Sequence, residues 1–287
     1  MSFRQVFTVF FSLLSLALAW APPVYSGYSQ VWVSSFEGAA DSPPPTSQWN
    51  LIAGGVVNNG EYQRYTKSKV NLRLSGKGTL QLIPRGDKTA PMGWTSGRVE
   101  SNYKFTPVAG KLTRIQARLR LGGSPMVNKK GIWPAFWILG NSNRHGTKWP
   151  ASGEIDIMEN INGQKLGYGG VHCDVTPGGI CNEPSGIVST IAIPDSNYHT
   201  WYVEFNRKSN TFTEQSITWY MDGKKFHSVT GAQIASAAVW KTLCQEPLFI
   251  ILNVAVGGDW TGPPNSKTLG GAGSMMEVAY VAHYVSK

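Results

Sequence analysis

The sequence predicts an all-β protein, a sandwich of two antiparallel sheets. Apolar and polar residues alternate in one segment after another, as they do along half-buried strands. Turns separate these segments, and the chain is rich in turn-forming residues, with 32 Gly and 17 Pro among 287 residues. The strand segments do not alternate with helical ones, which disfavours a parallel sheet with crossover helices.

After an opening segment at residues 20–48, which holds a stiff run of three prolines, the strand signals follow in chain order. They lie at residues 70–74, 80–82, 115–121, 201–205, 217–221, 248–256 and 278–285. Asp222 and Gly223, a strong hairpin pair, come directly after one of them. Residues 248–256 are nearly all apolar, which predicts a strand buried on both faces. Residues 232–243 alone look helical.

Residues 154–159 read Glu-Ile-Asp-Ile-Met-Glu and contain three acids on one predicted strand. Glu154 and Asp156 share a face because successive side chains of a strand alternate. Glu159 falls on the opposite face unless a one-residue bulge at or near Met158 turns it back. Three acids on one side of a buried strand repel each other, so the pattern indicates a function.

Hydrolysis of a glycosidic bond fits this pattern, since it needs one ionised carboxylate and a protonated one nearby. Glu154 and Glu159 would lie about 16 Å apart on a straight strand, whereas a retaining glycosidase needs about 5–5.5 Å and an inverting one about 6.5–9.5 Å. They can converge only if the sheet curves and the strand bulges. The charge of Asp156 would raise the pKa of a neighbouring Glu. A solvated strand edge and a calcium site are the alternatives.

Three segments resemble glycoside hydrolase family 16. Residues 153–159 are similar to its signature in the laminarinase-type form, which has an extra residue before the last Glu. Residues 131–137 resemble the tryptophan-rich segment of the family, and residues 253–260 resemble its late strand; residues 95–98 match more weakly. The resemblance implies a concanavalin A-like β-jelly-roll of two curved antiparallel sheets.

The resemblance also implies roles in a retaining double displacement. Glu154 would be the nucleophile. Glu159 would protonate the leaving oxygen and then activate water. Asp156 would hold a hydrogen bond to Glu154 and shift its pKa.

Aromatic and polar residues around these motifs are candidates for contacts with sugar. Indole rings stack on the apolar C–H faces of sugars. Trp133 and Trp137 would share one face of a strand and can equally be core residues, while the spacing of Trp149 and His172 from the acidic strand resembles that in the family. Arg98 and Asn59 could contact sugar hydroxyls, or they could be ordinary surface residues. We expect substrate binding by Trp137, Trp149, His172, Trp260, Arg98 and Asn59.

The chain has three cysteines without the paired spacing of a zinc site. Cys173 and Cys181 can close the loop between them, which would leave Cys244 as a buried thiol. Many members of the family hold a structural calcium with an acid in the closing strand, where this chain has Ala279. We therefore expect no metal and no cofactor.

The N-terminus resembles a secretory signal peptide, with Arg4 before an apolar run at residues 6–18. Cleavage after residue 19 would fit, and cleavage after residue 26 is a later option. The apolar run is shorter than the ~20 residues of a membrane span. We therefore expect a secreted, extracellular protein without a membrane partner, in which residues 27–287 form one catalytic β-sandwich domain.

The net charge of +9 does not indicate nucleic-acid binding, because the Lys and Arg residues are spread along the chain. We expect a monomer whose partner is a polysaccharide. The resulting hypothesis is an endo-acting hydrolase of β-1,3 linkages in a β-glucan. Alternatives are an endo-β-1,3-galactanase, a transglycosylase, and a lectin-like binding module on the same fold. Retention of both Glu154 and Glu159 disfavours the last.

Overall fold

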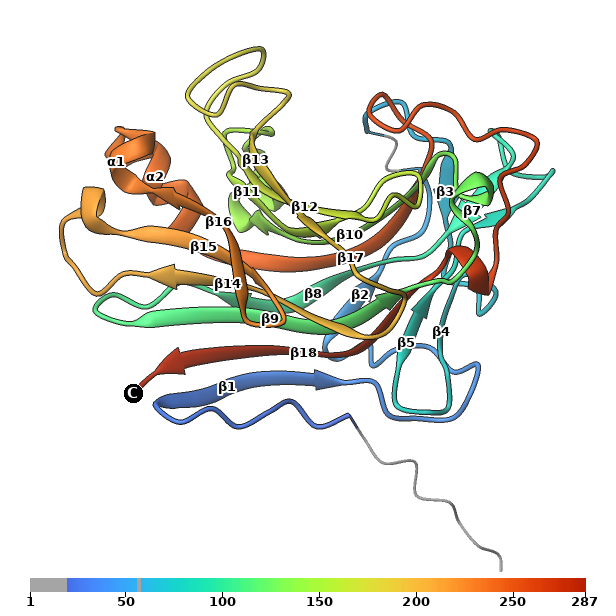
Figure 1. Cartoon of the computed structure of the whole chain (residues 1–287), viewed down its shortest axis with the longest axis horizontal. Coiled ribbons are helices and arrows are strands. Elements are labelled where there is room, and N and C mark those ends of the chain that lie inside the picture. Colours follow the sequence, from blue (N-terminus) through green and yellow to red (C-terminus); the bar gives the residue numbers. More distant parts are fainter. Residues whose placement is uncertain (1–19, 56–57) are drawn as a thin grey trace, which may run out of the picture.

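Two curved antiparallel sheets pack face to face in the computed structural model (Figure 1), which describes residues 20–55 and 58–287. The expected signal peptide at residues 1–19 lies outside the described residues. The eight-stranded sheet consists of β1 (Tyr28–Ser35), β4 (Leu72–Leu74), β5 (Leu80–Leu82), β9 (Leu112–Leu121), β14 (His199–Asn206), β15 (Ser216–Met221), β16 (Lys224–Thr230) and β18 (Met276–Ser286). The seven-stranded sheet consists of β2 (Trp49–Leu51), β8 (Arg98–Phe105), β10 (Ile132–Gly140), β11 (Glu154–Glu159), β12 (Leu166–His172), β13 (Ile187–Ala192) and β17 (Leu248–Val256).

The predicted all-β sandwich is confirmed, and most of the predicted strands lie within it. Asp222 and Gly223 both have positive φ and join β15 to β16, as the hairpin signal predicts. Every residue of β17 is buried, because one face meets the inter-sheet core and the other lies under side chains of the outer face. β18 forms antiparallel pairs with β9, β1 and β5.

The inter-sheet core contains two tryptophans from the eight-stranded sheet, and glycines on β12 make room for them. A Cβ on Gly167 would lie 2.3 Å from the Trp201 ring, and one on Gly169 would lie 2.7 Å from the Trp219 ring. Both distances are too short for any side chain. The glycines of β12 therefore allow Trp201 and Trp219 to reach the underside of the seven-stranded sheet.

Three features differ from the sequence-based expectations. β1 lies within the expected opening segment. A small sheet of β3 (Gln63–Tyr65), β6 (Arg85–Gly86) and β7 (Trp94–Ser96) includes a parallel pair, β3 with β7. The prediction of one helix at residues 232–243 is wrong: α1 (Gly231–Ile234) and α2 (Ala237–Cys244) are separate.

The helix breaks where local hydrogen bonding competes with the helical backbone. Ala235 has a φ of 55°, and the Ser236 side chain accepts a hydrogen bond from the Val239 N–H as the N-cap of α2. The remaining helical turns are η1 (Met126–Asn128), η2 (Asn141–His145), η3 (Phe212–Glu214) and η4 (Ala272–Ser274). No helix in the described part of the chain is long and apolar enough to cross a membrane.

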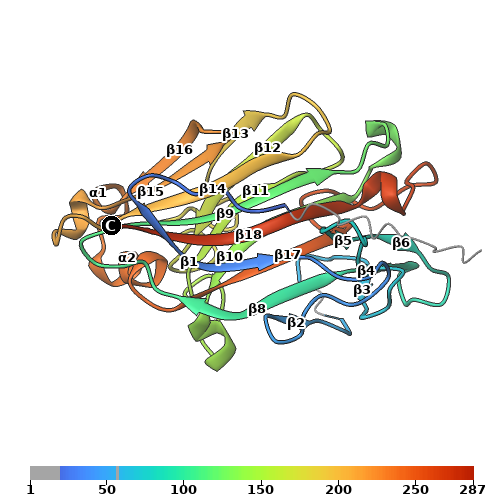
Figure 2. The same ribbon diagram turned by 90° about the horizontal axis from the view of Figure 1, so that it is seen from below.

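Residues 20–27 run across the outer face of the eight-stranded sheet before β1 begins beside β18 (Figure 2). The Trp20 ring lies 4.8 Å from the Tyr198 ring. The Tyr25 hydroxyl donates to Gln116 at 3.0 Å, and the Tyr284 hydroxyl donates to the Pro23 carbonyl at 2.9 Å. This segment therefore covers aromatic side chains that would otherwise face water.

A chain that starts at Gly27 is expected to be less stable than one that starts at Trp20. Loss of the packing of Trp20 and Tyr25 should lower the free energy of unfolding by roughly 2–4 kcal/mol, from buried apolar area and aromatic pairing. Urea unfolding of the two proteins, followed by tryptophan fluorescence, measures the difference. Equal midpoints with equal slopes would contradict this prediction.

Candidate active site

The three acids of β11 lie on one face because the strand contains a bulge. Glu154 pairs with Leu139, Asp156 with Trp137 and Glu159 with Ala135 on β10, and the register shifts between Asp156 and Glu159. Ile157 and Met158 both pack into the inter-sheet core, although they are consecutive. The predicted bulge at or near Met158 is thus confirmed, and it turns Glu159 to the same face as Glu154. This outer face of the seven-stranded sheet is called the open face below.

The open face lies between two loops in Figure 1: the loop between β12 and β13, in yellow, and the loop after β17, in red. The floor between them contains Leu139, Phe249 and Ile251, which Trp137 and Trp149 cover. The acids of β11 therefore lie on the sheet, with a loop on either side of them.

Burial raises the pKa of both glutamates. For Glu154, His172 and a hydrogen bond from Trp149 partly offset the effect. For Glu159, burial and the charge of Glu154 outweigh the hydrogen bond from Trp133, and the pKa rises to about 7. Near neutral pH, Glu159 can therefore hold a proton, which a general acid requires.

Asp156 carries the largest perturbation of the three acids. It is 4% exposed, and burial together with the charges of Glu154 and Glu159 raises its pKa well above the ordinary value. The charges of the neighbouring glutamates thus act on Asp156, and the effect of Asp156 on the pKa of a neighbouring Glu stays a prediction. Its Oδ2 atom has no hydrogen-bond partner among the described residues. The expected hydrogen bond to Glu154 is thus not made through that oxygen.

His172 lies directly across from Glu154 in the pairing of β11 with β12. Its Nε2 atom is 3.5 Å from Asp156 Oδ2, and its Nδ1 atom donates to Glu183 at 2.7 Å. Burial alone would lower the pKa of His172, but the hydrogen bond to Glu183 and the charges of Asp156 and Glu154 raise it to about 10. His172 is therefore an imidazolium at neutral pH.

Donor atoms of Glu154, Asp156 and His172 all lie within 4.8 Å of one another, a spacing compatible with a metal ion. Burial and the neighbouring charges favour the protonated forms of Asp156 and His172, so protons and a metal ion would compete for this cluster.

The predicted sugar-binding tryptophans take different positions. Trp137 is half-buried on the floor, and its Nε1 donates to Asn253 Oδ1 at 2.7 Å. Trp149 lies beside His172, with 5.7 Å between ring centres. Trp260 is 43% exposed on the loop after β17. An exposed indole near the acids is the arrangement that stacking on a sugar ring requires.

Trp133 has a role in the site that sequence reasoning missed. Its Nε1 donates to Glu159 Oε1 at 2.7 Å, and its ring packs edge to face with Trp260 at 5.3 Å. Tyr168 contacts Trp260 from the other side at 4.9 Å. The spacing of Trp133 and Trp137 on one strand face was the signal that could have assigned both to the open face.

Arg98 is almost fully buried, which rules out a surface role. Its guanidinium is paired with Glu100 at 2.8 Å and lies 5.2 Å from the centre of the Trp137 ring. Its charge also lowers the pKa of Glu154 and Glu61. Arg98 therefore belongs to the electrostatic environment of the acids.

Asn59 is exposed and lies beside the loop that carries Trp260, because its carbonyl accepts the Asp259 N–H at 2.7 Å. Glu61, two residues on, is a fourth acid of the site that sequence reasoning did not single out. Burial raises its pKa to about 7 against the hydrogen bond from Gln63, and its charge raises that of Glu159. Nothing in the local sequence marks Glu61, because its neighbours in the site come from distant strands.

Chemically, the arrangement separates two kinds of carboxyl group on one face. Glu154 lies beside a cation, His172, which favours its ionised form, while Glu159 has a pKa near the working pH. Carboxyl groups with different protonation preferences are the requirement for cleavage of a glycosidic bond. The tryptophans on the same face suit a saccharide substrate.

The comparisons with known proteins agree with this chemistry. Residues 124–242 match the family model of the XgeA-like, catalytic GH16 domain. The structure of endo-1,3-β-glucanase from Streptomyces sioyaensis is 36% identical in sequence, with a TM-score of 0.86, covering 93% of this chain and 99% of that one. The endo-β-1,3-glucanase from Pyrococcus furiosus is 29% identical, with a TM-score of 0.72, covering 91% and 95%.

Among curated sequences, glucan endo-1,3-β-glucosidase A1 of Niallia circulans is 31% identical over 290 residues. That match includes 91% of this chain but only 38% of the longer Niallia protein. The Streptomyces enzyme, by contrast, is matched over almost its whole length. These matches show that the chain belongs to glycoside hydrolase family 16.

Proposed function

We propose that this protein is a secreted, endo-acting hydrolase of β-1,3-glucan that works with retention of configuration. The observation that carries the proposal is the bulge in β11, which brings Glu154 and Glu159 to one face beside the buried Asp156. The 1,3-β-glucanase names of the Streptomyces, Pyrococcus and Niallia relatives support the substrate.

In the proposed reaction, Glu154 attacks the anomeric carbon while Glu159 gives its proton to the leaving oxygen. A glycosyl ester on Glu154 results, and the shortened chain leaves with a new hydroxyl. Glu159, now ionised, then takes a proton from water, and this water displaces Glu154 from the sugar. Two displacements restore the β configuration.

Secretion is supported by the disulfide between Cys173 and Cys181, since such bonds persist in oxidising compartments. Cys244 is a buried free thiol. The sequence-based reading of all three cysteines therefore agrees with the structure.

Hydrolysis of laminarin, mixed-linkage glucan and β-1,3-galactan by the purified protein, with products resolved by size, tests the substrate and the mode of action. Laminarin is expected to yield short oligomers of mixed length from the earliest times, as internal cleavage requires. Release of one small product throughout would contradict endo action. Preferential cleavage of galactan would favour the galactanase alternative, and products longer than the substrate would favour transglycosylation. Binding of a glucan without cleavage would favour a lectin-like role.

A further inference from the structure

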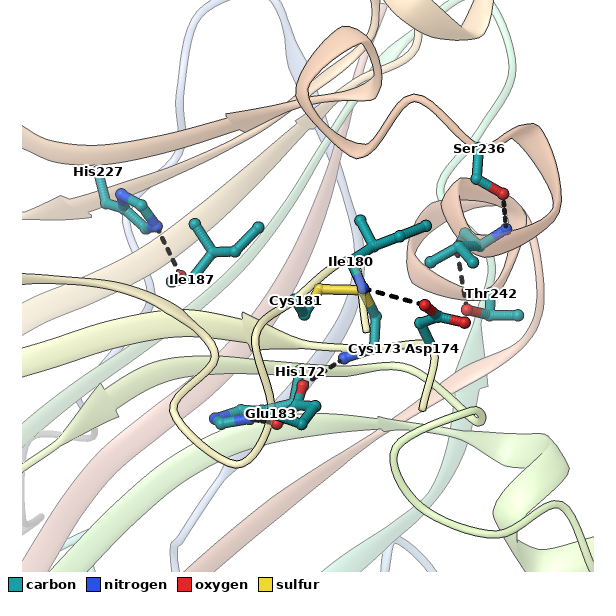
Figure 3. Close-up of a disulfide and its surroundings, with 11 residues drawn as sticks. His172, Cys173, Asp174, Ile180, Cys181, Glu183, Ile187, His227, Ser236 and Thr242 are labelled. Carbon is teal, nitrogen blue, oxygen red and sulfur yellow. Dashed lines mark hydrogen bonds and ion pairs between the residues drawn. A yellow bond between two sulfur atoms is a disulfide. The ribbon is translucent and has the colours of Figure 1, made fainter. Parts of the chain in front are cut away.

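Glu183 lies in the loop between β12 and β13, and its carboxylate is completely buried. Its Oε1 atom accepts the Cys173 N–H at 2.8 Å, and its Oε2 atom accepts Nδ1 of His172 at 2.7 Å (Figure 3). Among the ion pairs of the described residues, His172 is the cationic partner of Glu183. A buried carboxylate is costly unless a charge compensates it. Glu183 and protonated His172 therefore stabilise each other.

The loop is built to hold this contact. The disulfide between Cys173 and Cys181 closes it, one residue after His172 and two before Glu183. Gly178 and Glu183 exchange backbone hydrogen bonds across the closed loop. Gly186, with a φ of +71°, lies so close to His172 that a Cβ there would be 2.7 Å from Cε1 of the ring. The imidazole is thus confined between its own strand and the loop.

The other side of the imidazole faces the acids. Asp156 and Glu154 on β11 have atoms close to the imidazole, Glu159 lies farther along the same strand, and the charge of Arg98 on β8 also lowers the pKa of Glu154. Three acids in a buried cluster repel one another, so a cation within the cluster is needed for Glu154 to ionise. His172, which lowers the pKa of Glu154 more strongly than Arg98 does, is such a cation only while it holds its proton.

We infer that Glu183 is a positioning residue of this active site: from the disulfide-closed loop it keeps His172 oriented toward Asp156 and Glu154 and in its charged form. His172 in turn lowers the pKa of Glu154, Asp156 and Glu159. The charge of His172 acts on Glu154 more strongly than that of Glu183, which raises the same pKa. Removing the carboxylate of Glu183 is therefore expected to change the pKa of Glu154 mainly through the lost charge of His172.

The first measurement needs no substrate. Proton NMR follows the titration of the imidazole of His172, one of the five histidines of the chain, assigned by its absence in a His172→Gln variant. In the wild-type protein His172 is expected to stay protonated through pH 8, and in Glu183→Gln its midpoint is expected to fall by roughly 3–4 pH units, to its ordinary value of about 6.5 or below, because burial then disfavours the charged form. Asp174→Asn is the matched control, since Asp174 belongs to the same loop and accepts the Ile180 N–H at 3.0 Å without touching His172 (Figure 3). The control should titrate like the wild type.

The second measurement is the pH dependence of kcat/KM on laminarin, which rests on the proposed function. With His172 neutral, the pKa of Glu154 and of Glu159 rises, so both limbs of the profile are expected to move to higher pH in Glu183→Gln, with a roughly tenfold lower kcat at neutral pH. In a His172→Gln background, Glu183→Gln should cause no further movement of either limb. A loss of rate with both limbs unmoved would indicate a merely structural role and overturn the inference.

The two measurements separate the possible failures. If no glucan is cleaved, the proposed function fails, but the NMR titration still decides the role of Glu183. If Glu183→Gln does not fold, the wild-type titration remains decisive, because a midpoint near the ordinary value of about 6.5 for histidine would overturn the inference.

Discussion

A Glu154→Gln variant is expected to lose hydrolysis of laminarin by roughly 10⁴-fold or more, a loss of the size seen when hydrolases lose their nucleophile. The amide has almost the same shape as the carboxylate but cannot form the glycosyl ester. The neighbouring imidazolium of His172 would then have no ionised partner at this position. Initial rates of reducing-end release measure the loss.

Binding of the polymer should survive in this variant, because the tryptophans of the open face stay in place. Retention of the protein in laminarin-containing native gels tests this point. Glu37→Gln is a suitable control, since Glu37 is an exposed acid near the end of β1. Turnover by Glu154→Gln at more than a few per cent of the wild-type rate would refute the assignment of the nucleophile.

The features that sequence could predict are those set by local pattern. The alternation of acidic and apolar residues around Asp156, and the extra residue at Met158 that interrupts it, are properties of a few consecutive residues. They were enough to predict both the strand and its bulge. The buried strand β17 followed from its unbroken apolar run, and the hairpin after β15 from Asp222 and Gly223. In each case one short segment contains the whole signal.

Contacts between distant segments were not predictable in this way. Glu183 meets His172 across a loop that a disulfide closes, and Glu61 enters the site through a bridge to Gly257. The break at Ala235 depends on whether the Ser236 side chain caps a new helix or the first helix continues, and the sequence pattern does not distinguish the two. The pKa values of the acids likewise depend on burial, which cannot be inferred from the spacing of the acids in the sequence.

The remaining prediction concerns Glu159 and decides the stereochemistry. Glu159→Ala is expected to lower kcat on laminarin by about 10²–10⁴-fold, the usual contribution of a general acid. An aryl β-glucoside oligomer with a good leaving group should lose much less, because its leaving oxygen needs little protonation. Activity that requires protonated Glu159 falls as pH rises through its pKa of about 7, so the basic limb of the kcat/KM profile should disappear in the variant.

Azide distinguishes the two possible mechanisms on the same variant. Removal of the Glu159 side chain leaves space for a small anion next to the ester on Glu154, and an anion needs no general base to attack. In a retaining enzyme, azide displaces Glu154 and yields the β-glycosyl azide, which NMR identifies from the anomeric coupling. Glu159→Gln is the matched control, since it removes the acid but fills the space, and rescue should be weaker. An α-glycosyl azide would mean a single displacement, in which case the carboxyl groups of β11 act as an inverting pair.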